Sequence, residues 1–203
     1  KVAPGAELVT GPFADPIFSG IDFIALSPGV PKDTPAIAAV DLPLVSEIEL
    51  FAAGVREQAP GTKIIGITGS NGKTTVKEML AAILRTAAGS EKGILATQGN
   101  LNNDIGMPLT LLQLNAQHRY AVIEMGMNHP GEIDYLTRIA CPDAALITNA
   151  SGAHLEGLGS VEAVAHAKGE IFAGLSHKGA AIINADDAHA PLWRELAGTR
   201  SLL

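Results

Sequence analysis

The feature that most constrains the fold is a short apolar run followed at once by a glycine-rich turn and Gly-Lys-Thr-Thr, over residues 64–75. Glycines let the backbone curl so that its N–H groups point at one anion, and a following helix adds the positive end of its dipole. Lys73 can reach terminal phosphates, and the Thr74 hydroxyl can hold Mg²⁺. The segment therefore predicts a phosphate-binding loop between a strand and a helix. A glycine turn that binds nothing is the alternative.

The spacing of this loop differs from the strict Walker pattern. That pattern places a glycine five residues before the glycine of Gly-Lys, where this chain has Ile67. We still expect the turn to bind the nucleotide, because strand, turn, Lys-Thr and helix occur in the right order. The residues expected to bind ATP are Gly69, Ser70, Asn71, Gly72, Lys73, Thr74 and Thr75.

Strand-like and helix-like runs alternate after this loop, which predicts an α/β fold with a parallel sheet flanked by helices. Apolar spacing predicts a helix over 73–87 with an apolar face. A second helix is predicted over 161–175, and strands over 63–68, 120–125, 144–149 and 180–184. The residues expected on the apolar face of the first helix are Val76, Met79, Leu80, Ile83 and Leu84.

The residues before the loop suggest a separate, smaller domain. Strand-like runs at 21–26 and 43–46 are each followed by a helix-like run, and Pro60-Gly61 is a turn that marks the expected boundary. We therefore expect a partial Rossmann-like α/β domain over 1–61 and a larger domain over 62–203. The first part is too short for a complete doubly wound domain.

Bulk properties exclude several classes of protein. The net charge is −7 with no basic tract, which makes nucleic acid a poor candidate partner. The single cysteine, Cys141, excludes an internal disulfide and suits a reducing cytosol. No apolar run is long enough to span a membrane as a helix. We expect a cytoplasmic protein that binds its anionic ligand through a local site.

Polar residues follow the predicted strands where each strand ends. Glu124 ends one strand, and Asn149 ends the next, before a loop that contains His154. Ligands of parallel sheets bind at these carboxyl ends, and carboxylates are natural Mg²⁺ ligands. Glu124 is a metal ligand or an ordinary surface acid, and His154 a metal ligand or a loop histidine. Lys168 lies in an otherwise apolar helix, where a solvated lysine is the alternative.

Longer motifs make the chain recognisable. The loop Ile67–Thr75 resembles the ATP loop of the Mur ligases, which build the peptide stem of bacterial peptidoglycan. The motifs that support this resemblance cover roughly residues 62–197 and lie at 99–110, 123–133, 154–160 and 167–172. They are most similar to the family member that adds D-Ala-D-Ala to UDP-N-acetylmuramoyl-tripeptide.

Residues 1–60 instead resemble the sibling that adds D-glutamate to UDP-N-acetylmuramoyl-L-alanine. The segments that indicate this are 11–15, 20–31 and 46–51. The resemblance changes near residues 69–76, so the chain looks like a hybrid, natural or artificial. The resemblance also implies that the central ATPase domain stops part-way and that the third, amine-binding domain is missing, so a nucleotide-binding fragment without ligase activity is a further alternative.

The resemblance implies a set of functional residues. Lys73 would hold ATP phosphates, Thr74 and Glu124 a first Mg²⁺, and His154 with a carbamylated Lys168 a second Mg²⁺. Lys73, His154 and Lys168 would be the catalytic residues. The implied partners are UDP-N-acetylmuramoyl-peptide and D-Ala-D-Ala, with the protein a monomer that neither binds nucleic acid nor inserts in a membrane. The candidate substrate contacts are Ser27, Asn100, Asn103 and Asn149.

Overall fold

The computed structural model describes residues 18–26, 30–31, 33–152, 155–176 and 178–203. The chain divides into two compact units, Lys1–Leu50 and Phe51–Leu203. Helix α2 (Glu47–Gln58) crosses this division. None of the described helices is both long and apolar enough to cross a membrane.

The described part of the first unit is a small βαβ arrangement. Strands β1 (Ile24–Leu26) and β2 (Leu44–Ser46) pair in parallel, and the short helix α1 (Pro35–Ala38) lies between them in sequence. Proline at the start of α1 fits a helix N-terminus, where its missing N–H costs nothing. Strand β1 is shorter than the strand predicted over 21–26, because Ile21 and Phe23 are exposed and lie outside the pairing with β2.

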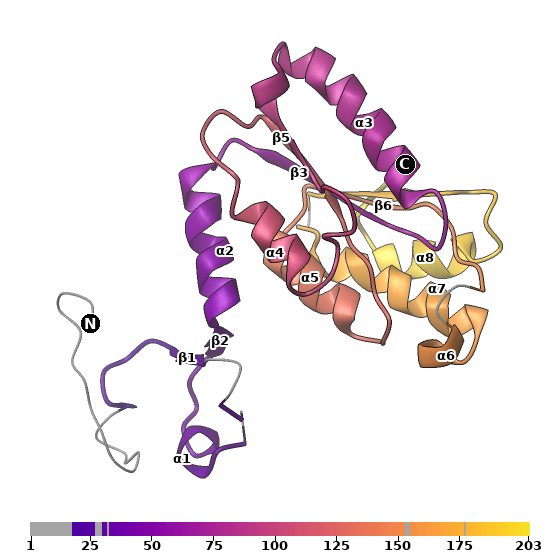
Figure 1. The fold of residues 1–203 in the computed structure, drawn as a ribbon. Helices are drawn as coiled ribbons and strands as arrows, with labels where there is room; N and C mark the ends of the chain where they lie inside the picture. The colour runs from indigo at the N-terminus through magenta and orange to yellow at the C-terminus, as the bar shows by residue number, and fades with distance from the viewer. Residues whose placement is uncertain (1–17, 27–29, 32, 153–154, 177) are drawn as a thin grey trace. The chain divides into compact units, whose positions relative to one another are not determined.

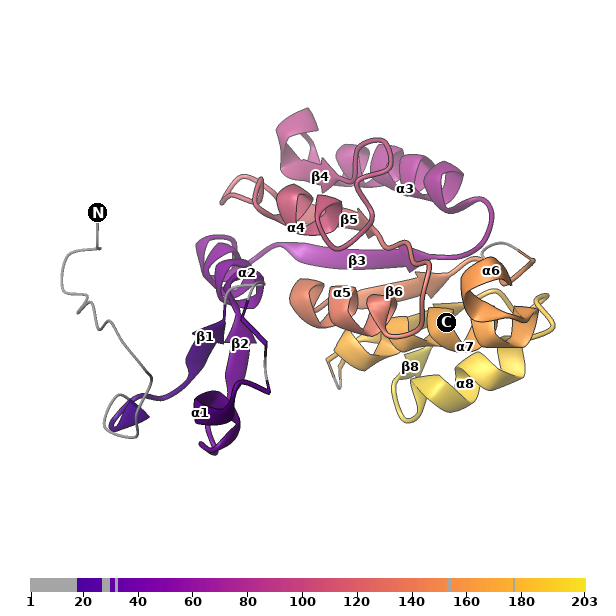
Figure 2. The same cartoon turned by 60° about the horizontal axis from the view of Figure 1, so that its bottom comes forward.

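The second unit is built on one six-stranded sheet in which every neighbouring pair of strands is parallel, in the order β4-β5-β3-β6-β7-β8 (Figures 1 and 2). The central strand β3 therefore lies between β5 and β6, and the carboxyl ends of these three strands meet at one edge. The strands are β3 (Lys63–Thr68), β4 (Ile94–Ala96), β5 (Tyr120–Glu124), β6 (Ala144–Ile147), β7 (Ala180–Ile183) and β8 (Ser201–Leu202).

Helices cover both faces of this sheet, with α3 on one face and α5, α7 and α8 on the other (Figures 1 and 2). The predicted α/β fold with a parallel sheet flanked by helices is confirmed. The helices are α3 (Lys73–Ala88), α4 (Gly106–Leu111), α5 (Glu132–Ala140), α6 (Leu155–Leu158), α7 (Val161–Gly169) and α8 (Ala190–Ala197), with 3₁₀ turns η2 (Glu91–Gly93) and η3 (Glu170–Gly174).

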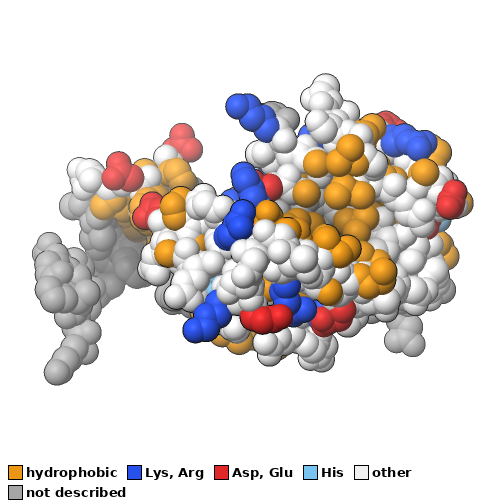
Figure 3. All heavy atoms as spheres, turned by 90° about the horizontal axis from the view of Figure 1, so that it is seen from above, with side chains coloured by type: hydrophobic (Ala, Val, Ile, Leu, Met, Phe, Trp, Pro, Cys, Tyr) orange, Lys and Arg blue, Asp and Glu red, His pale blue; other side chains and the backbone are white. Residues whose placement is uncertain are grey.

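The predicted apolar face of α3 is partly wrong. Met79 and Ile83 are 61% and 63% exposed, and apolar side chains gather on the face seen from above in Figure 3, the side on which Figure 1 places α3. The side that packs on the sheet instead contains Lys77 and Ala81, together with the predicted Val76, Leu80 and Leu84. A buried lysine thus replaces an apolar residue in the packed stripe.

The helix predicted over 161–175 also ends early. α7 stops at Gly169, and residues 170–174 form η3. Here the Ile171 carbonyl accepts a hydrogen bond from the Thr137 hydroxyl at 2.7 Å, while Ile171 and Phe172 are buried. Packing against α5 therefore overrides the helical periodicity of the sequence.

Candidate nucleotide and metal site

The turn between β3 and α3 has the backbone form of an anion-binding loop. Gly72 adopts a left-handed conformation (φ 73°) immediately before α3, and no described side chain caps the N-terminus of this helix. A Cβ on Gly69 would lie 1.8 Å from the Thr148 hydroxyl oxygen, so only glycine fits there. The N–H groups at the start of α3 are thus left for an external anion.

The segment that follows β6, residues 148–151, holds this loop in shape; we call it the clamp. The Asn149 side chain accepts from the Asn71 N–H through Oδ1 and donates to the Asn71 carbonyl through Nδ2, both at 3.0 Å. The Thr148 hydroxyl also donates to the Asn71 carbonyl, at 2.9 Å. The Ser151 N–H donates to Ser70 Oγ at 2.9 Å. The loop is therefore fixed before any ligand binds.

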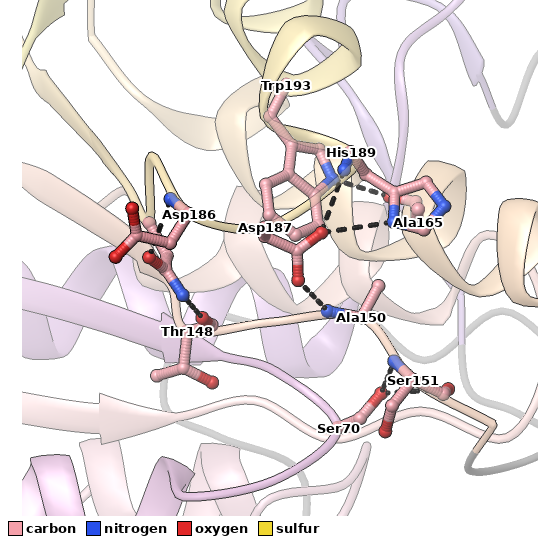
Figure 4. A network of polar contacts seen from close by, with 10 residues as sticks. Ser70, Thr148, Ala150, Ser151, Ala165, Asp186, Asp187, His189 and Trp193 are labelled. Carbon is pink, nitrogen blue, oxygen red and sulfur yellow. Dashed lines mark hydrogen bonds and ion pairs between the residues drawn. The ribbon is translucent and has the colours of Figure 1, made fainter.

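The clamp is anchored in turn by residues after β7 (Figure 4). Asn184 Nδ2 donates to the Thr148 carbonyl at 2.9 Å, and Asp187 Oδ2 accepts from the Ala150 N–H at 2.9 Å. Asp187 also accepts from the His189 backbone N–H and pairs with His189 Nδ1. Burial alone would raise the pKa of Asp187, but the hydrogen bonds from His189 and Ala150 outweigh it and lower that pKa.

A hydroxyl and a carboxylate meet directly behind the loop. The Thr74 hydroxyl donates to Glu124 Oε2 at 3.2 Å, and Asn102 Nδ2 donates to Glu124 Oε1 at 3.0 Å. Glu124 is only 2% exposed, so it is not an ordinary surface acid. No group of three or more His, Cys, Asp or Glu among the described residues could hold a metal. An Mg²⁺ ion at this edge would take its other oxygen ligands from phosphate and water.

Two lysines approach each other at this edge. Lys73 Nζ donates to the Gly69 carbonyl at 2.7 Å, and burial lowers its pKa while Glu124 opposes that shift. Lys168, on α7, is 2% exposed, and no hydrogen bond or ion pair joins its amino group to a residue that the structure describes. Burial, and secondarily the charge of Lys73, lower the pKa of Lys168 to about 7. The alternative of a solvated Lys168 is therefore wrong, because the side chain is buried.

The structure places the predicted substrate contacts in different surroundings. Asn149 is engaged with the phosphate loop, and Asn103 Oδ1 accepts from the Gly106 N–H at 2.8 Å, at the start of α4. Asn100 is exposed. Ser27 and His154 lie outside the described residues.

Sequence reasoning missed several residues that shape the site. Asn102 lies within the motif at 99–110, yet nothing in the pattern singles it out from its neighbours. Thr97 follows β4 and contacts Glu124 on β5, and Asp187 follows β7 and contacts Ala150 after β6. The order of the strands in the sheet therefore decides these partners. Only Lys77 left a signal, since it occupies a position of α3 beside the apolar residues 76, 80 and 84.

Comparison with known proteins identifies the family. The family model described as the Mur ligase middle domain matches residues 67–202. The chain belongs to the Mur ligase family. A UDP-N-acetylmuramoyl-tripeptide–D-alanyl-D-alanine ligase of Haemophilus influenzae is 54% identical over 133 residues, 66% of this Mur ligase chain and 29% of that protein. The MurF ligase of Thermotoga maritima, solved in complex with ADP, superposes with a TM-score of 0.66 at 33% identity, over 81% of this chain and 38% of that one.

A second kind of relative matches more of this Mur ligase chain. A UDP-N-acetylmuramoylalanine–D-glutamate ligase of Dechloromonas aromatica is 44% identical over 190 residues, which is 92% of this chain and 40% of that protein. A match over 92% of the chain must include most of the residues before the phosphate loop. In all three cases the chain spans well under half of its relative's length.

Proposed function

We propose that this chain supplies the ATP-binding part of an ATP-dependent amide ligase that adds D-Ala-D-Ala to a UDP-N-acetylmuramoyl-tripeptide. The supporting observation is the pairing of Thr74 with Glu124 directly behind an anion-binding loop. The name of the Haemophilus influenzae relative supplies the substrate class, and the ADP complex of the Thermotoga maritima relative supplies the nucleotide. This proposal places the protein in the cytoplasm, in the synthesis of peptidoglycan precursors.

The residues present fit Mg²⁺ and a nucleotide. The uncapped start of α3 offers backbone donors to phosphate oxygens, and Thr74 and Glu124 offer the oxygen ligands that a hard cation prefers. When bound, Mg·ATP supplies the phosphoryl group that activates the substrate carboxylate as an acyl phosphate. Lys73 would then exchange the Gly69 carbonyl for phosphate oxygens and help bring two anions together.

Lys168 fits the proposal as a carbamylated metal ligand. Only a neutral amine attacks CO₂, and with a pKa of about 7 roughly half of the Lys168 side chains are neutral at pH 7. The nitrogen forms a bond to carbon, one C=O electron pair moves onto oxygen, and the nitrogen loses a proton. The product is an anionic carbamate. It would be attracted to Lys73 and could hold a second Mg²⁺ together with His154.

The remaining assignments belong to the same proposal. Residues 1–61 would form part of the UDP-sugar domain, with Ser27 as a contact, and residues 62–203 part of the ATPase domain. Asn100 and Asn103 would lie near the reacting carboxylate, and the protein would act as a monomer.

The decisive experiment measures phosphate release from ATP together with amide product. The wild-type chain should release phosphate with UDP-N-acetylmuramoyl-tripeptide and form amide only when D-Ala-D-Ala is added. T74V should lose most of this activity, because it removes an Mg²⁺ ligand. T86V is the matched control on the same helix, since Thr86 is exposed and distant in sequence from the loop. Absence of ADP binding would contradict the proposal, and ADP binding without turnover would favour the alternative of a nucleotide-binding fragment without ligase activity.

D-glutamate addition is a second candidate. The match to the Dechloromonas aromatica relative, which includes most of the residues before the loop, favours it. The same assay separates the two, since this reading expects product from UDP-N-acetylmuramoyl-L-alanine and D-glutamate and none from the tripeptide pair.

A further inference from the structure

Lys77 is a buried cation that the proposed chemistry does not use. It lies on α3, one turn after Thr74, and is 1% exposed. Burying an ammonium group costs several kcal/mol unless hydrogen bonds and an opposite charge compensate. A leucine or methionine at this position would avoid the cost of burying a charge, yet the chain has a lysine here. The lysine therefore indicates a specific task for its amino group.

The contacts of the amino group show where it acts. Lys77 Nζ donates to the Thr97 carbonyl at 2.6 Å and pairs with Glu78 Oε1 at 2.8 Å. The Glu78 side chain is 60% exposed, so this ion pair is largely screened by water. The buried bond to Thr97, just beyond the end of β4, is the specific interaction.

Thr97 passes this contact on to the carboxylate. Its N–H donates to the Val122 carbonyl at 3.0 Å, and its hydroxyl oxygen accepts from the Glu124 N–H at 2.9 Å. Thr97 therefore fixes the end of β5, on which Glu124 lies. One face of α3 thus contacts Glu124 twice, directly through Thr74 and indirectly through Lys77 and Thr97.

We infer that Lys77 is a positioning residue that sets the distance between Thr74 and Glu124 and so builds the Mg²⁺ site. This inference rests on the proposed function, because it assumes that the pair binds Mg²⁺ with a nucleotide. The amino group of Lys77 contacts the Thr97 carbonyl and Glu78, so it acts on the Thr74–Glu124 pair through Thr97. Its loss should therefore weaken the Mg²⁺-dependent part of nucleotide binding and leave the part due to the loop N–H groups and Lys73.

The test is calorimetric titration of ADP into the 203-residue chain, with Mg²⁺ and with EDTA. The quantity of interest is the ratio of the two affinities. K77M should lower that ratio about ten-fold, as loss of an outer-shell partner does in metal sites, with the affinity in EDTA unchanged. E78Q is the matched control and should keep the wild-type ratio, because it leaves the bond from Lys77 to Thr97.

T97V tests the same path without touching the lysine. It removes the hydroxyl that holds the Glu124 N–H, whereas T97S keeps that hydroxyl and should behave as wild type. T97V should lower the ratio as K77M does, and the double variant should add little, because both act through one path. T97V also decides the question if K77M fails to fold.

The outcomes separate the two proposals. A wild-type chain whose ADP affinity does not respond to Mg²⁺ overturns the proposed function and this inference with it. A normal response in wild type that persists in K77M or T97V overturns the role of Lys77 alone. Equal losses with Mg²⁺ and with EDTA would show that Lys77 only supports the fold, and would also overturn it.

Discussion

Two lysines are buried in the second unit to almost the same extent, in very different surroundings. Lys77 on α3 donates to the Thr97 carbonyl and pairs with Glu78. Lys168 on α7 makes no such contact with any described residue and is repelled by Lys73. Hydrogen bonding offsets the cost of burying the Lys77 amino group. No hydrogen bond from a described residue offsets that cost for Lys168. Burial without compensation is typical of a group kept for reactivity.

The largest expected difference is in stability. K77M leaves the buried Thr97 carbonyl without its donor and should destabilise the fold by about 2 kcal/mol. K168M removes a buried amine that has no hydrogen-bond partner among the described residues and should stabilise the fold by about 2 kcal/mol. Urea unfolding at pH 7 in CO₂-depleted buffer measures both. A K168M variant as unstable as K77M would mean that the Lys168 amine is compensated after all.

The second difference is in the pH dependence of stability. Folding lowers the pKa of Lys168 from 10.5 to about 7, so between these values the unfolded chain binds more protons than the folded one. Stability therefore rises with pH from about 7 towards 10.5 and falls as pH drops through that window. The difference between wild type and K168M should show this slope, and K77M should retain it. Parallel pH curves for wild type and K168M would contradict the lowered pKa.

A smaller effect tests the repulsion between Lys73 and Lys168. K73M removes the second cause of the lowered pKa, so the pKa of Lys168 should rise and less of the amine should be neutral at pH 7. With ¹³C-bicarbonate, NMR should show a carbamate signal in wild type and K77M, and none in K168M. In K73M the pH at which the amine becomes available to CO₂ should move upward. An unchanged midpoint would show that burial acts alone.

The smallest effect lies away from both lysines. The lowered pKa of Asp187 contributes stability that is present above its ordinary value of 3.8 and is lost as pH falls through the lower folded pKa. D187N should therefore flatten the acid limb of the stability curve, by about 1 kcal/mol. K77M and K168M should leave that limb as in wild type. Acid unfolding followed by circular dichroism measures it.

Much of this architecture could be predicted from the sequence, because it depends on residues that are close together in the chain. The strand, glycine turn and helix around Lys73 follow from residue types, and alternation predicted the parallel sheet. Glu124 and Lys168 were singled out because one ends a strand and the other interrupts an apolar helix.

The remainder depends on contacts between distant segments. Periodicity placed Met79 and Ile83 in the core, while packing against the sheet selected Lys77 instead. Contacts such as that between Asp187 and the Ala150 N–H exist only because β6 and β7 become neighbours. The order of the strands in the sheet cannot be predicted from any single segment of the sequence.

The central claim is that the loop between β3 and α3 binds a nucleotide phosphate. Titration of ADP with Mg²⁺ into wild type and G69A tests it most directly, with circular dichroism to confirm that both are folded. Wild type should bind, and G69A should not, because its Cβ would collide with the Thr148 hydroxyl and displace the loop from the clamp. Absence of binding by folded wild type, or equal binding by both proteins, would contradict the account.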